Sequence, residues 1–145
     1  MDYATFPCFC FCSRRTANVV TTYYDAAIKS TGITTPQLAL LTGIRKLEAP
    51  SISQLAQEVR LQKSTLTRNL RPLIAAGYVI VGAGKNRRDV ALLLTPEGDA
   101  VIERAKPLWL QAQRDMVAAL GGEDAARQFL GFIERIQNLN QEEAT

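Results

Sequence analysis

Apolar residues recur at helical spacing along most of the chain, and this pattern predicts a mainly helical protein. The clearest case begins near Lys63, where apolar residues take the i, i+4, i+7 and i+8 positions of one buried stripe: Leu66, Leu70, Leu73 and Ile74. Glycines, prolines and N-cap residues divide the chain into successive helices. We expect them at about residues 9–29, 35–47, 51–59, 63–76, 96–120 and 123–139.

Two short runs rich in valine, isoleucine and leucine follow the helix that begins near Lys63. They lie at residues 78–81 and 90–94, and residues 82–86 between them contain two glycines, which predicts a turn. The chain therefore predicts an antiparallel hairpin. Two short helices around a tight turn near Arg60, followed by a hairpin, give the order of elements in a winged helix-turn-helix. The expected fold class is mainly α with a small β-hairpin wing.

Composition narrows the function. The chain has 145 residues and no run of about 18 apolar residues, so we expect one compact structural unit and no membrane span. It contains no histidine, which excludes His-based metal sites as well as Ser-His-Asp and Cys-His catalysis. Paired carboxylates and nucleophile–base spacings are also lacking, so we expect no enzyme and no cofactor, and we assign no metal ligands. The N-terminus lacks the basic region of a secretory signal, which predicts a cytoplasmic protein.

Charge is distributed unevenly along the chain. Residues 59–88 contain seven of the 17 basic residues and none of the 14 acidic ones, so the rest of the chain is mildly acidic. A basic segment in such a chain is typical of a protein that binds a polyanion. A solvated basic face would have the same composition, and the positions of the charges decide between the two interpretations.

These positions favour DNA binding. In a winged helix-turn-helix, the second short helix enters the major groove. Its predicted outer face, opposite the apolar stripe, holds Ser64, Arg68 and Arg71. Thr65 and Thr67 flank this face, and Lys63 stands at the start of the helix. These hydroxyls and cations can contact phosphates or guanine. The hairpin tip supplies a second basic site suited to the minor groove: Lys85, Arg87 and Arg88. Pro72 either kinks this helix or indicates that the helix starts later. The predicted partner is double-stranded DNA.

Several motifs resemble those of the MarR/SlyA family of transcriptional regulators. The run over residues 51–77, with its Ser-Thr-Leu-Thr-Arg-Asn-Leu segment, is similar to the helix-turn-helix of that family. The wing over residues 86–98 and the segment 32–37 before the second helix are also similar. Two positions depart from the family pattern: Arg60 stands where a glycine is frequent, and Asn86 stands where an acid usually precedes the two wing arginines. The resemblance covers nearly the whole chain.

The resemblance implies a homodimer that binds a pseudo-palindromic operator. The terminal helices, over residues 1–34 and 97–145, would form the dimer interface, and residues 35–96 would form the DNA-binding lobe. Family members usually repress nearby genes and release DNA when a small phenolic ligand or an oxidant arrives. A ligand pocket is implied between the lobe and the dimerisation helices.

The apolar content of the terminal helices also predicts a dimer, because they hold more apolar surface than a small winged lobe covers. The candidate interface residues are Phe6, Phe9, Phe11, Leu108, Phe129, Phe132 and Ile136. A monomer that packs its own termini together is the alternative. A winged helix can also serve as a protein-interaction module that never touches nucleic acid, although basic residues on both the helix and the wing argue against this.

Three cysteines, Cys8, Cys10 and Cys12, form a C-x-C-x-C motif at the start of the first helix. Their clustering does not suit a disulfide framework. They are small packing residues, a redox switch, or thiolate ligands of a soft metal ion. Resemblance to the organic-peroxide sensors of the MarR family implies a reactive cysteine at Cys10 and a tyrosine partner at Tyr24, with Arg14 in place of the other tyrosine. A guanidinium near a helix N-terminus would raise the reactivity of a thiol.

Overall fold

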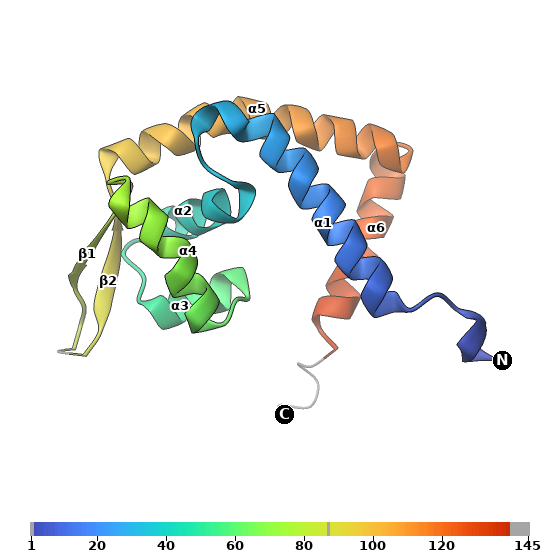
Figure 1. Ribbon diagram of the computed structural model, residues 1–145, viewed down its shortest axis with the longest axis horizontal. Coiled ribbons are helices and arrows are strands. Elements are labelled where there is room, and N and C mark those ends of the chain that lie inside the picture. Colours follow the sequence, from blue (N-terminus) through green and yellow to red (C-terminus); the bar gives the residue numbers. More distant parts are fainter. Residues whose placement is uncertain (1, 87, 140–145) are drawn as a thin grey trace. The chain divides into compact units, whose positions relative to one another are not determined.

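The computed structural model describes residues 2–86 and 88–139. It contains helices α1 (Phe9–Ile28), α2 (Thr35–Leu47), α3 (Ile52–Val59), α4 (Lys63–Ala75), α5 (Pro96–Leu120) and α6 (Glu123–Gln137), with strands β1 (Val79–Ala83) and β2 (Val90–Leu94) (Figure 1). Short 3₁₀ helices, Tyr3–Thr5 and Lys29–Thr31, flank α1. This confirms the predicted fold class. Within the described residues, no helix is both long and apolar enough to cross a membrane. The chain divides into two compact units, Met1–Trp109 and Leu110–Thr145.

Side-chain caps start α2, α3 and α5 where the sequence predicts. The Thr34 hydroxyl accepts a hydrogen bond from the backbone N–H of Gln37, and the Gln37 side chain accepts one from the N–H of Thr34, which caps α2. Ser51 and Gln54 make the same reciprocal pair at the start of α3. Thr95 supplies the capping hydroxyl of α5. Local hydrogen bonds therefore define the helix boundaries on either side of α4 and the wing.

The tight turn between α3 and α4 contains Arg60, whose φ of 53° lies in the left-handed region. A residue other than glycine costs roughly 1–2 kcal/mol there. The N–H of Arg60 donates to the carbonyl of Gln57 at 3.3 Å, and the N–H of Leu61 donates to that of Ala56 at 3.0 Å. These bonds hold the turn in spite of the arginine, and α4 begins at Lys63 as expected.

The core of the first unit joins α2, α3, α4 and the hairpin. Leu66, Leu70 and Leu73 of α4 are buried in one cluster with leucines of α2 and α3, as the stripe predicts. Ile74 is 39% exposed, so the prediction that it is buried is wrong. At about 100° per residue, Leu70 and Leu73 lie within about 40° of Leu66 around the helix, whereas Ile74 lies about 80° away. Ile74 is therefore at the edge of the buried stripe.

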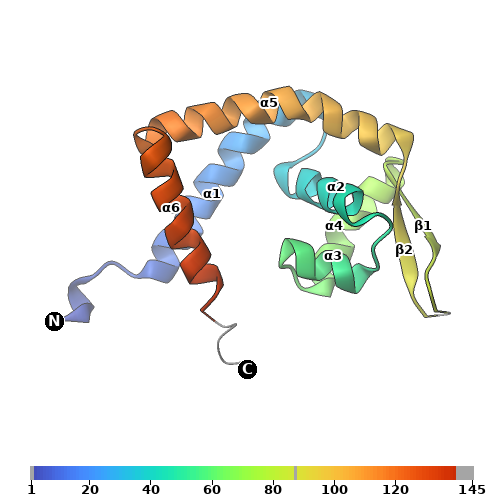
Figure 2. The same cartoon turned by 180° about the vertical axis from the view of Figure 1, so that it is seen from behind.

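The wing is an antiparallel pair in which Val79 of β1 lies opposite Leu94 of β2 (Figure 2). β1 extends further than the sequence predicts, because Gly82 and Ala83 belong to the strand and not to the turn. Gly82 is suited to this position because an added Cβ would lie 3.0 Å from the Leu93 side chain. The turn at the tip is correspondingly shorter than expected.

The second unit consists of the C-terminal part of α5 and of α6. Gly121 and Gly122 end α5 with φ values of 101° and 112°, and the N–H of Gly122 donates to the carbonyl of Val117 at 2.9 Å. Left-handed angles of this kind favour glycine, and the sequence predicts a break at this point. α6 ends at Gln137, short of the expected Leu139.

Candidate nucleic-acid interface

The outer face of α4 gathers cations and hydroxyls around one shallow hollow of about 500 Å³. Its lining consists of predicted DNA-binding residues: Lys63, Ser64, Thr67, Arg68 and Arg71. Thr65, which the sequence placed beside this face, is half-buried and does not line the hollow. The Thr67 hydroxyl donates to the carbonyl of Lys63 at 2.8 Å, so its lone pairs remain available as acceptors. α4 therefore presents a surface that can both donate and accept hydrogen bonds.

The cations of this hollow have no acidic partner among the described residues. The ion pairs of the described chain lie elsewhere: Arg45 with Asp99 and Glu103, Lys46 with Glu58, and Arg127 with Glu123. Positive charges that are exposed on one helix face and not neutralised attract anions. The α4 hollow is therefore an electropositive surface.

The N-terminus of α4 adds backbone donors to this surface. Gln62 is the N-cap, and its side chain makes no capping hydrogen bond. The first N–H groups of a helix have no partner within the helix. In α4 the side chain of the N-cap does not supply one either. Free N–H groups at a helix N-terminus are suited to binding a phosphate.

Pro72 lies inside α4, which runs on to Ala75. The alternative of a later helix start is therefore wrong, because the helix begins at Lys63. A proline has no N–H to donate, so the carbonyl of Arg68 loses its bond from position i+4. This local loss falls at the C-terminal edge of the cationic face.

The tip of the wing is less basic than residues 59–88 suggest. Lys85 and Arg88 are exposed, and Arg87 lies outside the described residues. The turn also contains Asp89, an acid that directly follows the basic segment of residues 59–88 in the sequence. The Asn86 amide donates to the Asp89 carboxylate at 3.4 Å. The acidic residue that the family pattern places before the arginines is thus absent, but an acid follows them.

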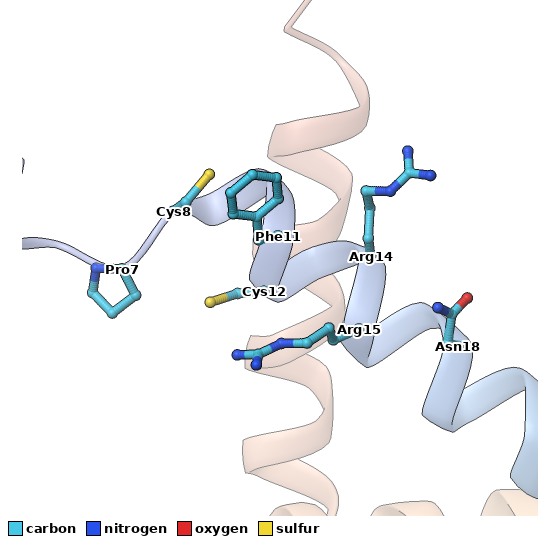
Figure 3. A pocket seen from close by; sticks show the side chains of 7 residues that line it. All are labelled: Pro7, Cys8, Phe11, Cys12, Arg14, Arg15 and Asn18. Carbon is cyan, nitrogen blue, oxygen red and sulfur yellow. The ribbon is translucent and has the colours of Figure 1, made fainter.

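The cysteine motif surrounds the first turn of α1. Cys8 is the N-cap, and the N–H of Cys12 donates to its carbonyl at 3.0 Å. Cys8 and Cys10 are exposed and Cys12 is half-buried, so the first two thiols are not core residues of this chain. Cys8 and Cys12 line a hollow of about 540 Å³ together with Arg14 (Figure 3), whereas Cys10 does not line it.

Tyr24 lies far from this motif along the same helix. At a rise of about 1.5 Å per residue, α1 separates Tyr24 from Cys10 by about 21 Å. Within one chain, the structure therefore does not bring these two candidate residues together. Tyr24 is buried, and burial raises the pKa of its phenol. Across the described residues, no group of His, Cys, Asp or Glu side chains is arranged to hold a metal ion.

Another hollow, of about 360 Å³, lies between α2 and the part of α5 in the first unit. Its walls combine apolar side chains, an indole ring, hydroxyls and cations: Leu38, Ala39, Ile102, Trp109, Thr35, Thr42, Arg45 and Lys106. The Thr35 hydroxyl oxygen is buried without a hydrogen-bond partner. Arg45 is held by Glu103 at 2.7 Å and Asp99 at 3.2 Å, and the Glu103 hydrogen bond raises its pKa most. Lys106 forms no ion pair with any described residue.

A sequence model of the MarR family matches residues 33–90, which cover α2, α3, α4, β1 and the start of β2. A search of curated proteins gave no match. Among solved structures, the M. tuberculosis transcriptional regulator MosR in complex with DNA is 30% identical to this chain. The similarity covers 91% of this chain and 97% of MosR, with a TM-score of 0.79.

More distant structures share the fold. PcaV from Streptomyces coelicolor, in complex with its natural ligand, is 22% identical over 96% of each chain, with a TM-score of 0.83. BpsR from Bordetella bronchiseptica is 18% identical over 95% of this chain and 98% of its own, with a TM-score of 0.81. The family match and the similarity to MosR confirm what the sequence motifs predict: the chain belongs to the MarR family of transcriptional regulators, which are DNA-binding proteins and not enzymes.

Proposed function

We propose that the protein is a cytoplasmic transcriptional repressor that binds a pseudo-palindromic operator as a homodimer. A small ligand or the oxidation of a cysteine would release it. The observation that carries the proposal is the outer face of α4, where Lys63, Arg68 and Arg71 have no acidic partner among the described residues. A surface with charges of both signs would have favoured a protein partner.

In this proposal α4 lies in the major groove and makes two kinds of contact. Arg68 and Arg71 reach base edges, where a guanidinium can donate two hydrogen bonds to O6 and N7 of guanine. Ser64 and the backbone N–H groups of the first turn lie at the N-terminal end of the helix and suit a phosphate. Similar proteins support this mode, because MosR was crystallised in complex with DNA, and CouR, which is 20% identical, is bound to a 23-mer DNA duplex in its structure.

The wing would bind the adjacent minor groove or its phosphates through Lys85 and Arg88. Arg87 joins this set from the sequence alone. Asp89 reduces the attraction of the tip for phosphate, so we expect the wing to contribute less to affinity than α4 does.

A second copy of the chain would cover apolar surface that one chain leaves in water. Exposed apolar patches of this kind mark interfaces. The candidate interface residues that are exposed are Phe6, Phe9, Phe11, Phe132 and Ile136, and Leu108 and Phe129 are half-buried. We assign residues 1–34 and 97–145 to dimerisation and residues 35–96 to the DNA-binding lobe. Equilibrium sedimentation that shows only monomer at micromolar concentration would contradict the dimer.

The hollow between α2 and α5 is the proposed effector site. Trp109 offers a face for an aromatic ring, Lys106 a charge for an acidic group, and Thr35 a free hydroxyl. These features suit a small aromatic acid. PcaV was crystallised with its natural ligand, and DNA binding by BpsR is regulated by 6-hydroxynicotinic acid.

The effector site can be tested by fluorescence because Trp109 is the only tryptophan of the chain. Titration with hydroxybenzoates should change its emission and lower the affinity of the protein for DNA. If neither changes at concentrations up to about 1 mM, the hollow is not an effector site for this class of ligand, and cysteine oxidation is left as the means of release.

DNA binding itself is tested with the duplex that flanks the protein's own gene, by fluorescence anisotropy at several salt concentrations. Each phosphate that is neutralised should add about −0.9 to the slope of log K against log salt concentration. We expect tighter binding to this duplex than to a scrambled one of equal length. No binding even at low salt would contradict the proposal and favour a winged-helix module that binds protein.

A further inference from the structure

Arg60, in the turn between α3 and α4, has a backbone conformation that does not suit an arginine. Its φ of 53° and ψ of 43° lie in the left-handed region, where a Cβ is unfavourable and glycine is preferred. The turn itself uses only backbone groups, because its hydrogen bonds run from the N–H groups of Arg60 and Leu61 to carbonyls of α3. Glycine would make the same bonds without strain. Because strain of this kind is concentrated at functional sites, the arginine side chain is a candidate for a function outside the turn.

The side chains around Arg60 divide between the core and the solvent. Leu61 packs against the core of the first unit, whereas Arg60 and Gln62 are exposed. Lys63, which lines the α4 hollow, is three residues further on, so its Cα lies within about 11 Å of that of Arg60. Residues 59–88 contain no acid. Arg60 therefore places a further cation directly before the cationic face of α4.

The turn joins two helices that meet DNA in different ways. In a helix-turn-helix the first helix crosses the phosphate backbone and the second enters the major groove, and in this chain these helices are α3 and α4. An exposed side chain on the segment between them lies where the protein passes from the backbone into the groove. An arginine suits this place, because its guanidinium can donate two parallel hydrogen bonds to a phosphate.

We propose that Arg60 binds a backbone phosphate at the edge of the major groove that α4 enters. This inference rests on the proposed function, in which α4 is the recognition helix. The contact adds affinity for any duplex and carries no sequence information. The left-handed arginine lowers the stability of the protein without DNA, and the phosphate contact compensates for this when DNA is bound. The alternative is that the guanidinium stabilises the turn through contacts within the chain.

Two substitutions separate the charge from the backbone strain. Arg60→Gln removes the charge and keeps a Cβ in the left-handed position, whereas Arg60→Gly removes both. Arg104→Gln is the matched control for total charge, because Arg104 is exposed on α5. Anisotropy at several salt concentrations gives the affinity and its salt dependence, both for the duplex that flanks the protein's own gene and for a scrambled one. Urea denaturation at one fixed protein concentration gives the stability.

We expect both Arg60 variants to bind either duplex less tightly, by about two- to fivefold for each contact and by about 4- to 25-fold for the two contacts of a homodimer. The slope of log K against log salt concentration should become less steep by about 0.9 for each contact. The ratio of specific to scrambled affinity should stay the same, and Arg104→Gln should change either affinity by less than about twofold. Arg60→Gly should have a higher urea midpoint than Arg60→Gln, because glycine adopts the left-handed turn without strain.

Unchanged affinity and salt slope in both Arg60 variants, or an equal loss in Arg104→Gln, would overturn the proposal and leave the proposed function intact. A loss confined to the specific duplex would indicate a base contact and would also overturn it. A lower urea midpoint in both variants with an unchanged salt slope would assign the guanidinium to the turn instead of to DNA. If the unsubstituted protein binds neither duplex, the proposed function is wrong and the phosphate contact with it.

Discussion

The Thr35 hydroxyl is buried without a hydrogen-bond partner, and we expect its removal to stabilise the free protein. A buried polar group left unpaired costs about 1–3 kcal/mol. Thr35→Val replaces the hydroxyl with a methyl group of similar shape and keeps the β-branch at the first position of α2. The backbone N–H of Thr35, which donates to the Asp25 carboxylate at 2.6 Å, is not changed. The free energy of unfolding should therefore rise by about 1 kcal/mol or more.

The matched control is Thr35→Ser, which keeps the hydroxyl and removes the methyl group. Loss of a buried carbon costs about 0.8 kcal/mol, so this variant should be less stable than the unsubstituted protein. Urea denaturation at one fixed protein concentration measures both changes, and a shift in midpoint at constant m reports a change in stability. Because Thr35 lines the hollow between α2 and α5, Thr35→Val should also weaken binding of aromatic acids by about two- to tenfold.

A Thr35→Val protein that is less stable at unchanged m would refute the reasoning that the hydroxyl is unpaired and costly. A more stable variant that binds aromatic acids as tightly as before would retain the stability argument. It would, however, contradict the role of the hydroxyl in the hollow.

Two further predictions concern the wing and α1. In Gly84→Ala the new Cβ would lie 2.5 Å from the Asp89 carbonyl oxygen, to which the Gly84 N–H donates at 3.0 Å, so the backbone of the wing tip must shift. The urea midpoint should fall, and the affinity of the folded protein for DNA should fall as well. Unchanged affinity in anisotropy would argue against a wing contact. Burial raises the pKa of Tyr24 above its usual 10.0, so the folded protein holds the phenolic proton more tightly than the unfolded chain does. The stability that this contributes is fully present below pH 10.0 and declines as the pH rises above that value. Tyr24→Phe should lessen this decline in urea titrations between about pH 9 and 11, and an equal decline in both proteins would speak against the desolvation.

Most of the fold could be predicted because the signals are local. The caps at Thr34, Ser51 and Thr95 depend on neighbours within three residues, and the buried stripe of α4 depends on helical period alone. The extension of β1 through Gly82 could not be predicted in this way. A glycine after a strand is typical of a turn, and only its pairing with β2 shows that it belongs to the strand.

The α4 face could be predicted because one helix supplies all of it. The hollow between α2 and α5 could not be predicted from the sequence, because its walls come from two separate segments, residues 35–45 and 102–109. The unpaired Thr35 hydroxyl is a consequence of how these segments pack. For the cysteines, the motif is evident in the sequence, but which of the thiols line the hollow depends on the residue at which α1 begins. With Cys8 as the N-cap, Cys12 and Arg15 share the hollow and Cys10 lies outside it.

The most direct test of DNA recognition by α4 compares Arg68→Ala with Arg104→Ala. Both arginines are exposed and form no ion pair with any described residue, but Arg68 lines the α4 hollow and Arg104 lies on α5. In anisotropy at equal salt, we expect Arg68→Ala to weaken binding to the specific duplex by about 5- to 150-fold, the range for loss of one bidentate base contact. Arg68→Ala should also reduce the ratio of the affinity for the specific duplex to the affinity for a scrambled one. Arg104→Ala should change the affinity for the specific duplex by less than about twofold. Equal losses in the two variants would contradict recognition by α4, because binding would then follow the total charge of the protein.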